Sequence, residues 1–132
     1  MDGFTMSSFQ SEGYTKIEGL VDAKTIKTMS QYFENKIKRG EWSAKSDISK
    51  NEASKFGYYA DPLVEVMLKE CQHAIEQHTG LLLEPTYSFS RVYQEGEELL
   101  PHTDRPSCEI SATINVACTG SIWPIWMQYK DK

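Results

Sequence analysis

The spacing of apolar residues changes at Pro85, and this change constrains the fold more than any other feature of the sequence. Before Pro85, apolar residues recur at the spacing of one face of an α-helix. After it, β-branched and aromatic residues alternate with polar ones, which is typical of half-buried strands. Helices followed by strands, with no helical pattern between the strands, predict an α+β protein in which an antiparallel sheet packs against the earlier helices.

The first helix is expected to begin after Asp22, a residue type that favours the N-cap position, and to end near Gly40. Its apolar stripe recurs at helical spacing and consists of Ile26, Met29, Phe33 and Ile37. Residues 13–19, ahead of this helix, are predicted to form a short strand. The mainly helical part of the single domain is thus assigned to residues 1–84, and the strands to residues 85–132.

The second helix has the clearest start, because Asp61 can cap it and Pro62 suits its first position. One broad face then continues to Gly80 and carries Leu63, Met67, Cys71, Ala74, Ile75 and His78. Between the two helices, residues 41–55 are polar and lose the periodicity. This stretch is predicted to be a mobile surface loop that could serve as a lid.

The strands are predicted over residues 87–94, 109–118 and 122–129. Pro124 places the last of them at a sheet edge or a bulge, because proline cannot donate a ladder hydrogen bond. Trp123 and Trp126 would point to opposite faces of this strand, so at least one of them is expected to be exposed. So few strands are expected to leave an apolar sheet edge unpaired.

The composition describes one soluble domain over residues 1–132, with a formal charge of −5 and 39% apolar residues. No apolar run is long enough to span a membrane, and no secretory leader is visible. Three sparse cysteines, expected to be small buried apolar residues, are Cys71, Cys108 and Cys118. We therefore expect a protein of the reducing cytoplasm. The acidic sequence has no basic stripe, which argues against nucleic acid as a partner.

His102 and Asp104 occupy alternate positions in a stretch that is expected to be extended. Residues i and i+2 of a strand project from the same face, so an imidazole and a carboxylate can converge on one point. Such a pair supplies two of the three ligands of the 2-His-1-carboxylate site of non-haem Fe(II) oxygenases. The sequence therefore predicts a metal site at His102 and Asp104, but no histidine follows His102 to complete it.

Other interpretations of these residue types stay open. The stretch could be a solvated turn in which Asp104 caps a backbone N–H group. His73 and His78 are spaced so that they point to different sides of the second helix and cannot share a metal ion. Cys118 or Glu109 could substitute for the third ligand, on proximity alone.

The run from Arg91 to Asn115 resembles the iron-ligand segment of the Fe(II)/2-oxoglutarate dioxygenases, in particular their prolyl 4-hydroxylase-like branch. In that branch a strand with Arg-x-Tyr leads to an acidic turn with glycine, then to Pro-His-x-Asp, and then to a strand with Ser-x-Thr. The matching residues are Arg91, Tyr93, Gly96, Pro101, His102, Asp104, Arg105, Ser111 and Thr113.

This resemblance implies that His102 and Asp104 bind Fe(II), and that the Tyr93 phenol hydrogen-bonds a carboxylate of the cosubstrate 2-oxoglutarate. It also implies that Thr113 belongs to the cofactor-binding residues. The implied fold is a partial double-stranded β-helix, jelly-roll or cupin-like, on which the N-terminal helices pack. The implied activity is the hydroxylation of a small-molecule or peptide substrate.

Relatives of this kind also use a distal histidine and, after it, a Lys or Arg that pairs with 2-oxoglutarate. The chain reaches Lys132 without either, so the expectation is an Fe(II)/2-oxoglutarate-dependent oxygenase or a truncated form of one that is inactive alone. The alternative is a non-catalytic half-jelly-roll module that dimerises through its open sheet edge. Both hypotheses predict a homodimer, because exposed strand edges and apolar surface favour pairing. A nucleic-acid base dealkylase of the same superfamily would want a basic groove, which this acidic sequence does not suggest.

Overall fold

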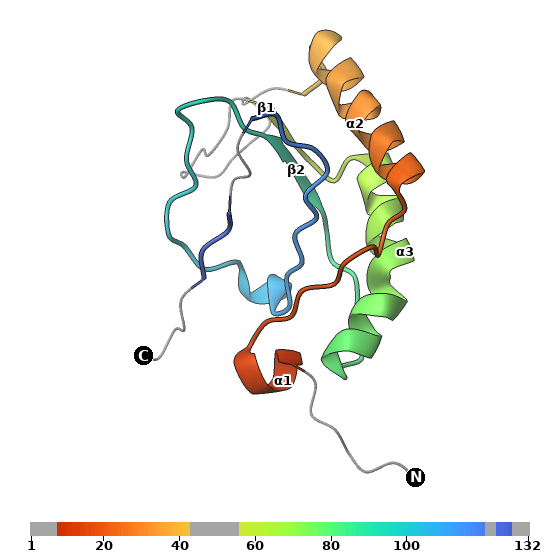
Figure 1. The fold of residues 1–132 in the computed structure, drawn as a ribbon, viewed down its shortest axis with the longest axis vertical. Helices are drawn as coiled ribbons and strands as arrows, with labels where there is room; N and C mark the ends of the chain where they lie inside the picture. The colour runs from red at the N-terminus through yellow and green to blue at the C-terminus, as the bar shows by residue number, and fades with distance from the viewer. Residues whose placement is uncertain (1–7, 43–55, 121–123, 128–132) are drawn as a thin grey trace.

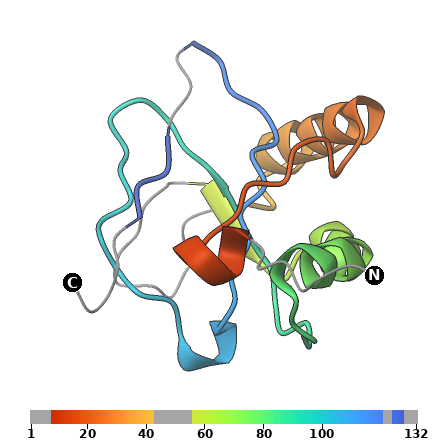
Figure 2. The same ribbon diagram turned by 60° about the horizontal axis from the view of Figure 1, so that its bottom comes forward.

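The computed structural model describes residues 8–42, 56–120 and 124–127 (Figure 1). These ranges contain helices and an antiparallel pair of strands, so the predicted α+β class is confirmed. The elements are α1 (Ser8–Glu12), α2 (Ala23–Lys38), β1 (Phe56–Tyr59), α3 (Pro62–Thr79), β2 (Phe89–Val92) and the short 3-10 helix η2 (Pro106–Cys108). α2 and α3 lie on one side of the sheet, and most of the chain that follows β2 lies on the other (Figures 1 and 2). Among the described helices, none is long and apolar enough to cross a membrane.

Helix α2 begins and ends where the sequence predicts. The Asp22 side chain accepts a hydrogen bond from the Thr25 N–H at 2.7 Å, and this bond lowers the pKa of the Asp22 carboxyl. At the other end, Gly40 adopts a φ of 71°, a left-handed conformation that favours glycine. Met29, in the middle of the apolar stripe, is buried.

Helix α3 is also confirmed at both ends. Asp61 is its N-cap and accepts a hydrogen bond from the Leu63 N–H at 2.9 Å, while Pro62 opens the first turn. Gly80 ends the helix in the left-handed conformation, with a φ of 76°, and its N–H donates to the Glu76 carbonyl at 2.8 Å.

The sheet pairs β1 with β2 in antiparallel register, so that Phe56 faces Val92 and Tyr59 faces Phe89. β2 lies inside the predicted strand 87–94. No strand was expected at β1, because a four-residue run between a polar stretch and a helix cap carries too little alternation to identify it. Facing residues of such a pair share one face of the sheet.

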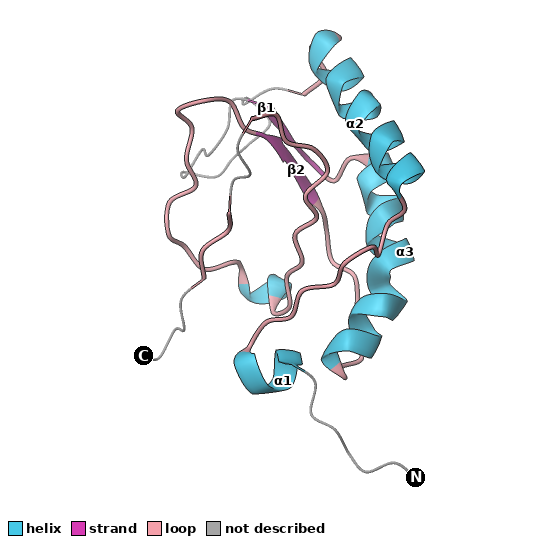
Figure 3. Ribbon diagram, in the orientation of Figure 1, coloured by secondary structure: helices cyan, strands magenta, loops and turns pink. Residues whose placement is uncertain are grey.

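The remaining strand predictions are wrong for the residues that the structure describes. Residues 13–19 and 109–118 are loops, and so is 124–127, the described part of the predicted strand 122–129 (Figure 3). A strand needs a neighbour that pairs with its N–H and C=O groups, so alternation alone does not produce one. The side chains of 109–118 are accordingly mostly exposed, and Ile114 is 40% exposed.

Trp42 is central to the core between the sheet and the helices and is only 1% exposed. Its ring stacks on Tyr58 of β1, with centroids 6.3 Å apart, and contacts Phe33 of α2 at 4.8 Å. The predicted mobile surface loop over residues 41–55 is therefore wrong at Trp42, because the large apolar area of an indole favours burial over exposure. Residues 43–55 lie outside the described part of the chain, and the lid prediction with them.

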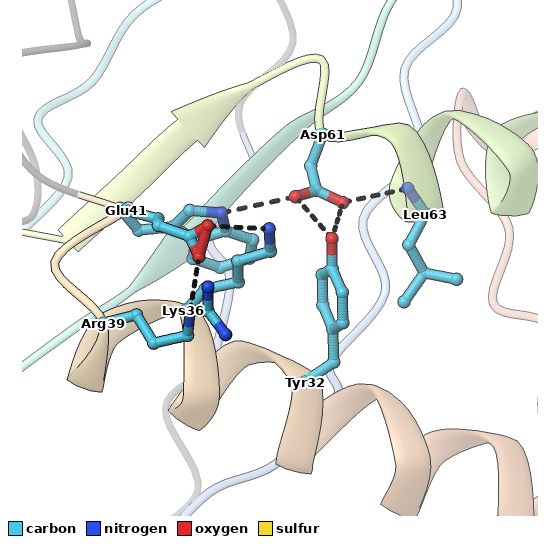
Figure 4. A network of polar contacts seen from close by, with 7 residues as sticks. Tyr32, Lys36, Arg39, Glu41, Asp61 and Leu63 are labelled. Carbon is cyan, nitrogen blue, oxygen red and sulfur yellow. Dashed lines mark hydrogen bonds and ion pairs between the residues drawn. The ribbon is translucent and has the colours of Figure 1, made fainter.

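A buried carboxylate, that of Asp61, joins α2 to the start of α3 (Figure 4). The Tyr32 O–H lies 3.0 Å from both carboxylate oxygens, and Trp42 Nε1–H donates to Oδ2 at 3.3 Å. Burial and the hydrogen bond to Asp61 raise the pKa of Tyr32. A buried carboxylate is stable only when its oxygens are hydrogen-bonded, and here the cap and the two aromatic residues meet that need together.

Candidate metal site

The two predicted metal ligands lie in the loop between β2 and η2, and their side chains are close together. His102 Nε2 is 3.5 Å from Asp104 Oδ1, and the two side chains are 36% and 46% exposed. The segment is not a strand, yet its side chains converge as the i, i+2 argument expects. The structure therefore brings together an imidazole nitrogen and a carboxylate oxygen on an accessible surface.

The backbone fixes which nitrogen of His102 is available. Nδ1 lies 2.8 Å from the Leu100 carbonyl oxygen, which can only accept a hydrogen bond, so we assign the ring proton to Nδ1. In the neutral ring Nε2 then carries a lone pair, and it faces the acceptor-only carboxylate of Asp104. Two acceptors in this arrangement repel each other unless a cation, either a proton on Nε2 or a metal ion, lies with them.

The Asp104 carboxylate is oriented in a similar way. Ser111 Oγ donates a hydrogen bond to Oδ2 at 2.5 Å, which leaves Oδ1 directed towards His102. Metal-binding sites commonly hold the ligand imidazole through a backbone carbonyl and the ligand carboxylate through a further hydrogen bond. Leu100 and Ser111 supply both of these supports.

Tyr87 joins this site to the sheet. It lies two residues before β2 and its ring contacts Tyr59 of β1, with centroids 5.2 Å apart. A hydrogen bond with Cys108 raises the pKa of Tyr87, burial and the charge of Asp104 act in the same direction, and Arg105 opposes them. The sequence reasoning missed this residue, although its period-two spacing from Phe89 was visible in the sequence.

The other predicted site residues are less informative. Tyr93 lies one residue beyond the end of β2 and is partly buried, and Thr113 is exposed in the loop after η2. Their predicted roles with 2-oxoglutarate stay predictions.

A third metal ligand is not found in the described part of the chain, where no group of three His, Cys, Asp or Glu side chains is placed to hold a metal ion. His73 and His78 are exposed on α3, on the opposite side of the sheet from most of the chain after β2 (Figure 2). Glu109 and Cys118 are exposed and join no such group. Within the described residues, the candidate site therefore consists of the two side chains of His102 and Asp104 alone.

The cysteines differ in their surroundings. Cys71 is buried as predicted, and this burial, with the nearby Glu70 charge, raises the pKa of its thiol. Cys108 is partly buried. Cys118 is exposed, contrary to prediction, because the strand that would have buried it does not form. All three are free thiols.

Two of the hollows in the described structure, of ≈ 310 Å³ and ≈ 370 Å³, border α2 and α3. The second includes Glu41 and Asp61, whose carboxylates already bind partners. His102 and Asp104, by contrast, are exposed, so the candidate site is a surface feature.

No protein-family model, curated protein or solved structure matches this chain. The resemblance of the run from Arg91 to Asn115 to the Fe(II)/2-oxoglutarate dioxygenases therefore rests on the residues themselves.

Proposed function

We propose that this chain is an Fe(II)- and 2-oxoglutarate-dependent oxygenase of the hydroxylase type, with His102 and Asp104 as two of its iron ligands. The observation that carries the proposal is the distance of 3.5 Å between two acceptor atoms, His102 Nε2 and Asp104 Oδ1. Each side chain is held in place by a hydrogen bond at its other polar atom, Nδ1 of His102 and Oδ2 of Asp104. The proposed fold is a partial jelly-roll in which β1 and β2 are the first paired strands.

The donor atoms suit the metal. Imidazole nitrogen and carboxylate oxygen are the ligand types of non-haem Fe(II) sites, and such sites leave coordination positions open. When bound, Fe(II) and 2-oxoglutarate supply the activation of dioxygen that C–H hydroxylation requires. The chain's own contribution is positional: the Leu100 carbonyl keeps the proton on Nδ1 of His102, and Ser111 binds Oδ2 of Asp104 so that Oδ1 faces His102, where the two side chains would hold the metal.

Two protein ligands hold a metal ion weakly, so a third ligand from elsewhere in the chain or from a second copy belongs to the proposal. The formal charge of −5 favours a small-molecule or peptide substrate over nucleic acid. The three free thiols fit a reducing compartment such as the cytoplasm.

The proposal is tested by an anaerobic titration of the purified chain with Fe(II) and 2-oxoglutarate. We expect a saturable visible charge-transfer band, because a 2-oxo acid that chelates iron absorbs in this way. Succinate, which lacks the 2-oxo group, is the matched control and should give no band. A chain that binds neither Fe(II) nor Co(II) by calorimetry would contradict the proposal.

A second candidate function, the half-jelly-roll module that pairs with a copy of itself, is favoured by a different observation. Apolar side chains near the end of the described chain are exposed, namely Ile125 at 59%, Trp126 at 89% and Met127 at 66%. The exposed Trp126 agrees with the expectation that one of the two tryptophans is uncovered. In the described sheet, β1 and β2 pair only with each other, so each keeps an outer edge for a further strand.

For this second candidate, Trp126→Ser is expected to convert a dimer into a monomer, because it removes from the interface the most exposed aromatic side chain of the described residues. Light scattering over a range of protein concentrations measures the change. Leu82→Ser is the control, since Leu82 is 95% exposed and follows α3. Wild-type protein that is monomeric at every concentration would exclude the module.

A further inference from the structure

Arg105 is the cation that directly follows the proposed metal ligand Asp104 in the chain. It is the N-cap residue of η2, with an extended backbone conformation. Its guanidinium carbon lies 5.6 Å from the centre of the Tyr87 ring. An arginine that rests on an aromatic face keeps the N–H groups at its edge available for a planar anion.

Tyr87 is itself held in position, so the guanidinium rests on a fixed support. The ring is tilted against Tyr59 of β1, and the phenol is hydrogen-bonded with Cys108 of η2. The charges of Asp104 and Arg105 both act on the Tyr87 phenol, which places the three side chains in one electrostatic cluster.

Arg105 has no acidic partner among the residues that the structure describes. The carboxylate of Asp104 is directed to Ser111 and His102, and Arg105 forms no ion pair with any described residue. By contrast, the exposed Arg39 on α2 binds Glu41 at 3.1 Å. Arg105 therefore shares the surroundings of Tyr87 with Asp104, and apart from its contact with the Tyr87 ring it uses its charge for no ion pair within the described fold.

We propose that Arg105, supported by Tyr87, is the anion-binding residue of this site and pairs with a carboxylate of the small molecule that binds at His102 and Asp104. This inference rests on the proposed function and deepens it, because it assigns within the described chain a cation for a dicarboxylate such as 2-oxoglutarate. Guanidinium and carboxylate match in a planar, two-bond geometry, which gives selectivity for carboxylates over neutral analogues.

The test separates metal binding from carboxylate binding. Co(II) affinity is measured first by calorimetry, and 2-oxoglutarate affinity is then measured on the Co(II)-loaded chain. Arg105→Gln is expected to keep the Co(II) affinity. It should raise the Kd for 2-oxoglutarate by about ten-fold or more, because a charge-assisted hydrogen-bonded pair is lost. Arg105→Lys should recover part of this loss, and Tyr87→Leu, which removes the aromatic support, should cause a smaller increase in Kd. The control Arg39→Gln should match the wild type.

An unchanged Kd for 2-oxoglutarate in Arg105→Gln would overturn the inference while leaving the proposed function intact. Wild-type protein that binds no Co(II) would instead overturn the proposed function. In that case the inference is tested separately by a titration of the metal-free chain with succinate. The NMR signal of the Arg105 Nε–H group reports binding. A saturable shift at this group, absent when the neutral diamide of succinate is added, supports a carboxylate site, and no shift rejects it.

Discussion

Replacement of Asp61 by Ala is expected to lower the free energy of unfolding by about 4 kcal/mol. The change removes a carboxylate that is 1% exposed, and the Tyr32 O–H and Trp42 Nε1–H then lose their buried acceptor. It also removes the N-cap of α3, whose loss alone costs about 1 kcal/mol. Urea denaturation followed by tryptophan fluorescence measures the difference.

The matched control is Asp22→Ala, which removes the N-cap of α2 on the surface. This variant should lose much less stability than Asp61→Ala, because water replaces the lost acceptor. Asp61→Asn should fall between the wild type and Asp61→Ala, since its amide keeps one acceptor oxygen but turns a donor group towards other donors. Equal losses in Asp61→Ala and Asp22→Ala would show that the buried network adds nothing to the cap.

Replacement of His102 or Asp104 by Ala is expected to weaken metal binding by about 100-fold or more, because each change removes one of the two proposed ligands. Both side chains are substantially exposed, so the free energy of unfolding of the apoprotein should change by less than about 0.5 kcal/mol. Calorimetric titration with Co(II) measures the affinity, and circular dichroism confirms that the fold is retained.

Two further variants sharpen this result. Ser111→Ala should weaken binding by about ten-fold, since it frees the carboxylate to rotate away from the metal. His73→Ala, which removes an exposed histidine on α3, should leave the affinity unchanged. Metal binding that depends on His73 as strongly as on His102 would refute the assignment of the site.

The helices could be predicted from the sequence because their signals are local. An N-cap such as Asp22 or Asp61 and a left-handed terminator such as Gly80 act through hydrogen bonds to residues a few positions away. Strands depend on a partner that is distant in the chain. The alternation after Pro85 therefore identified β2, but it did not reveal that residues 109–118 have no neighbour in the described sheet.

In the candidate site, too, the local features could be predicted from the sequence and the long-range contacts could not. Its two proposed ligands follow from i, i+2 geometry, which is local. One orienting contact is local, because Leu100 is close in sequence to His102. The other, between Ser111 and Asp104, depends on the turn through η2. The stacking of Arg105 on Tyr87 joins residues on opposite sides of β2 in the chain, and no spacing rule could have predicted it.

The stack of Trp42 on Tyr58 has a consequence for how this protein can vary over evolution. It holds Trp42 and Tyr58 on the core through a contact that belongs to the scaffold alone. Because the entropy of closing a loop rises only slowly with its length, insertions or deletions between these anchors should cost little stability. The aromatic pair thus allows the sequence between Trp42 and β1 to diversify while the helices and the loop that carries His102 and Asp104 keep their geometry.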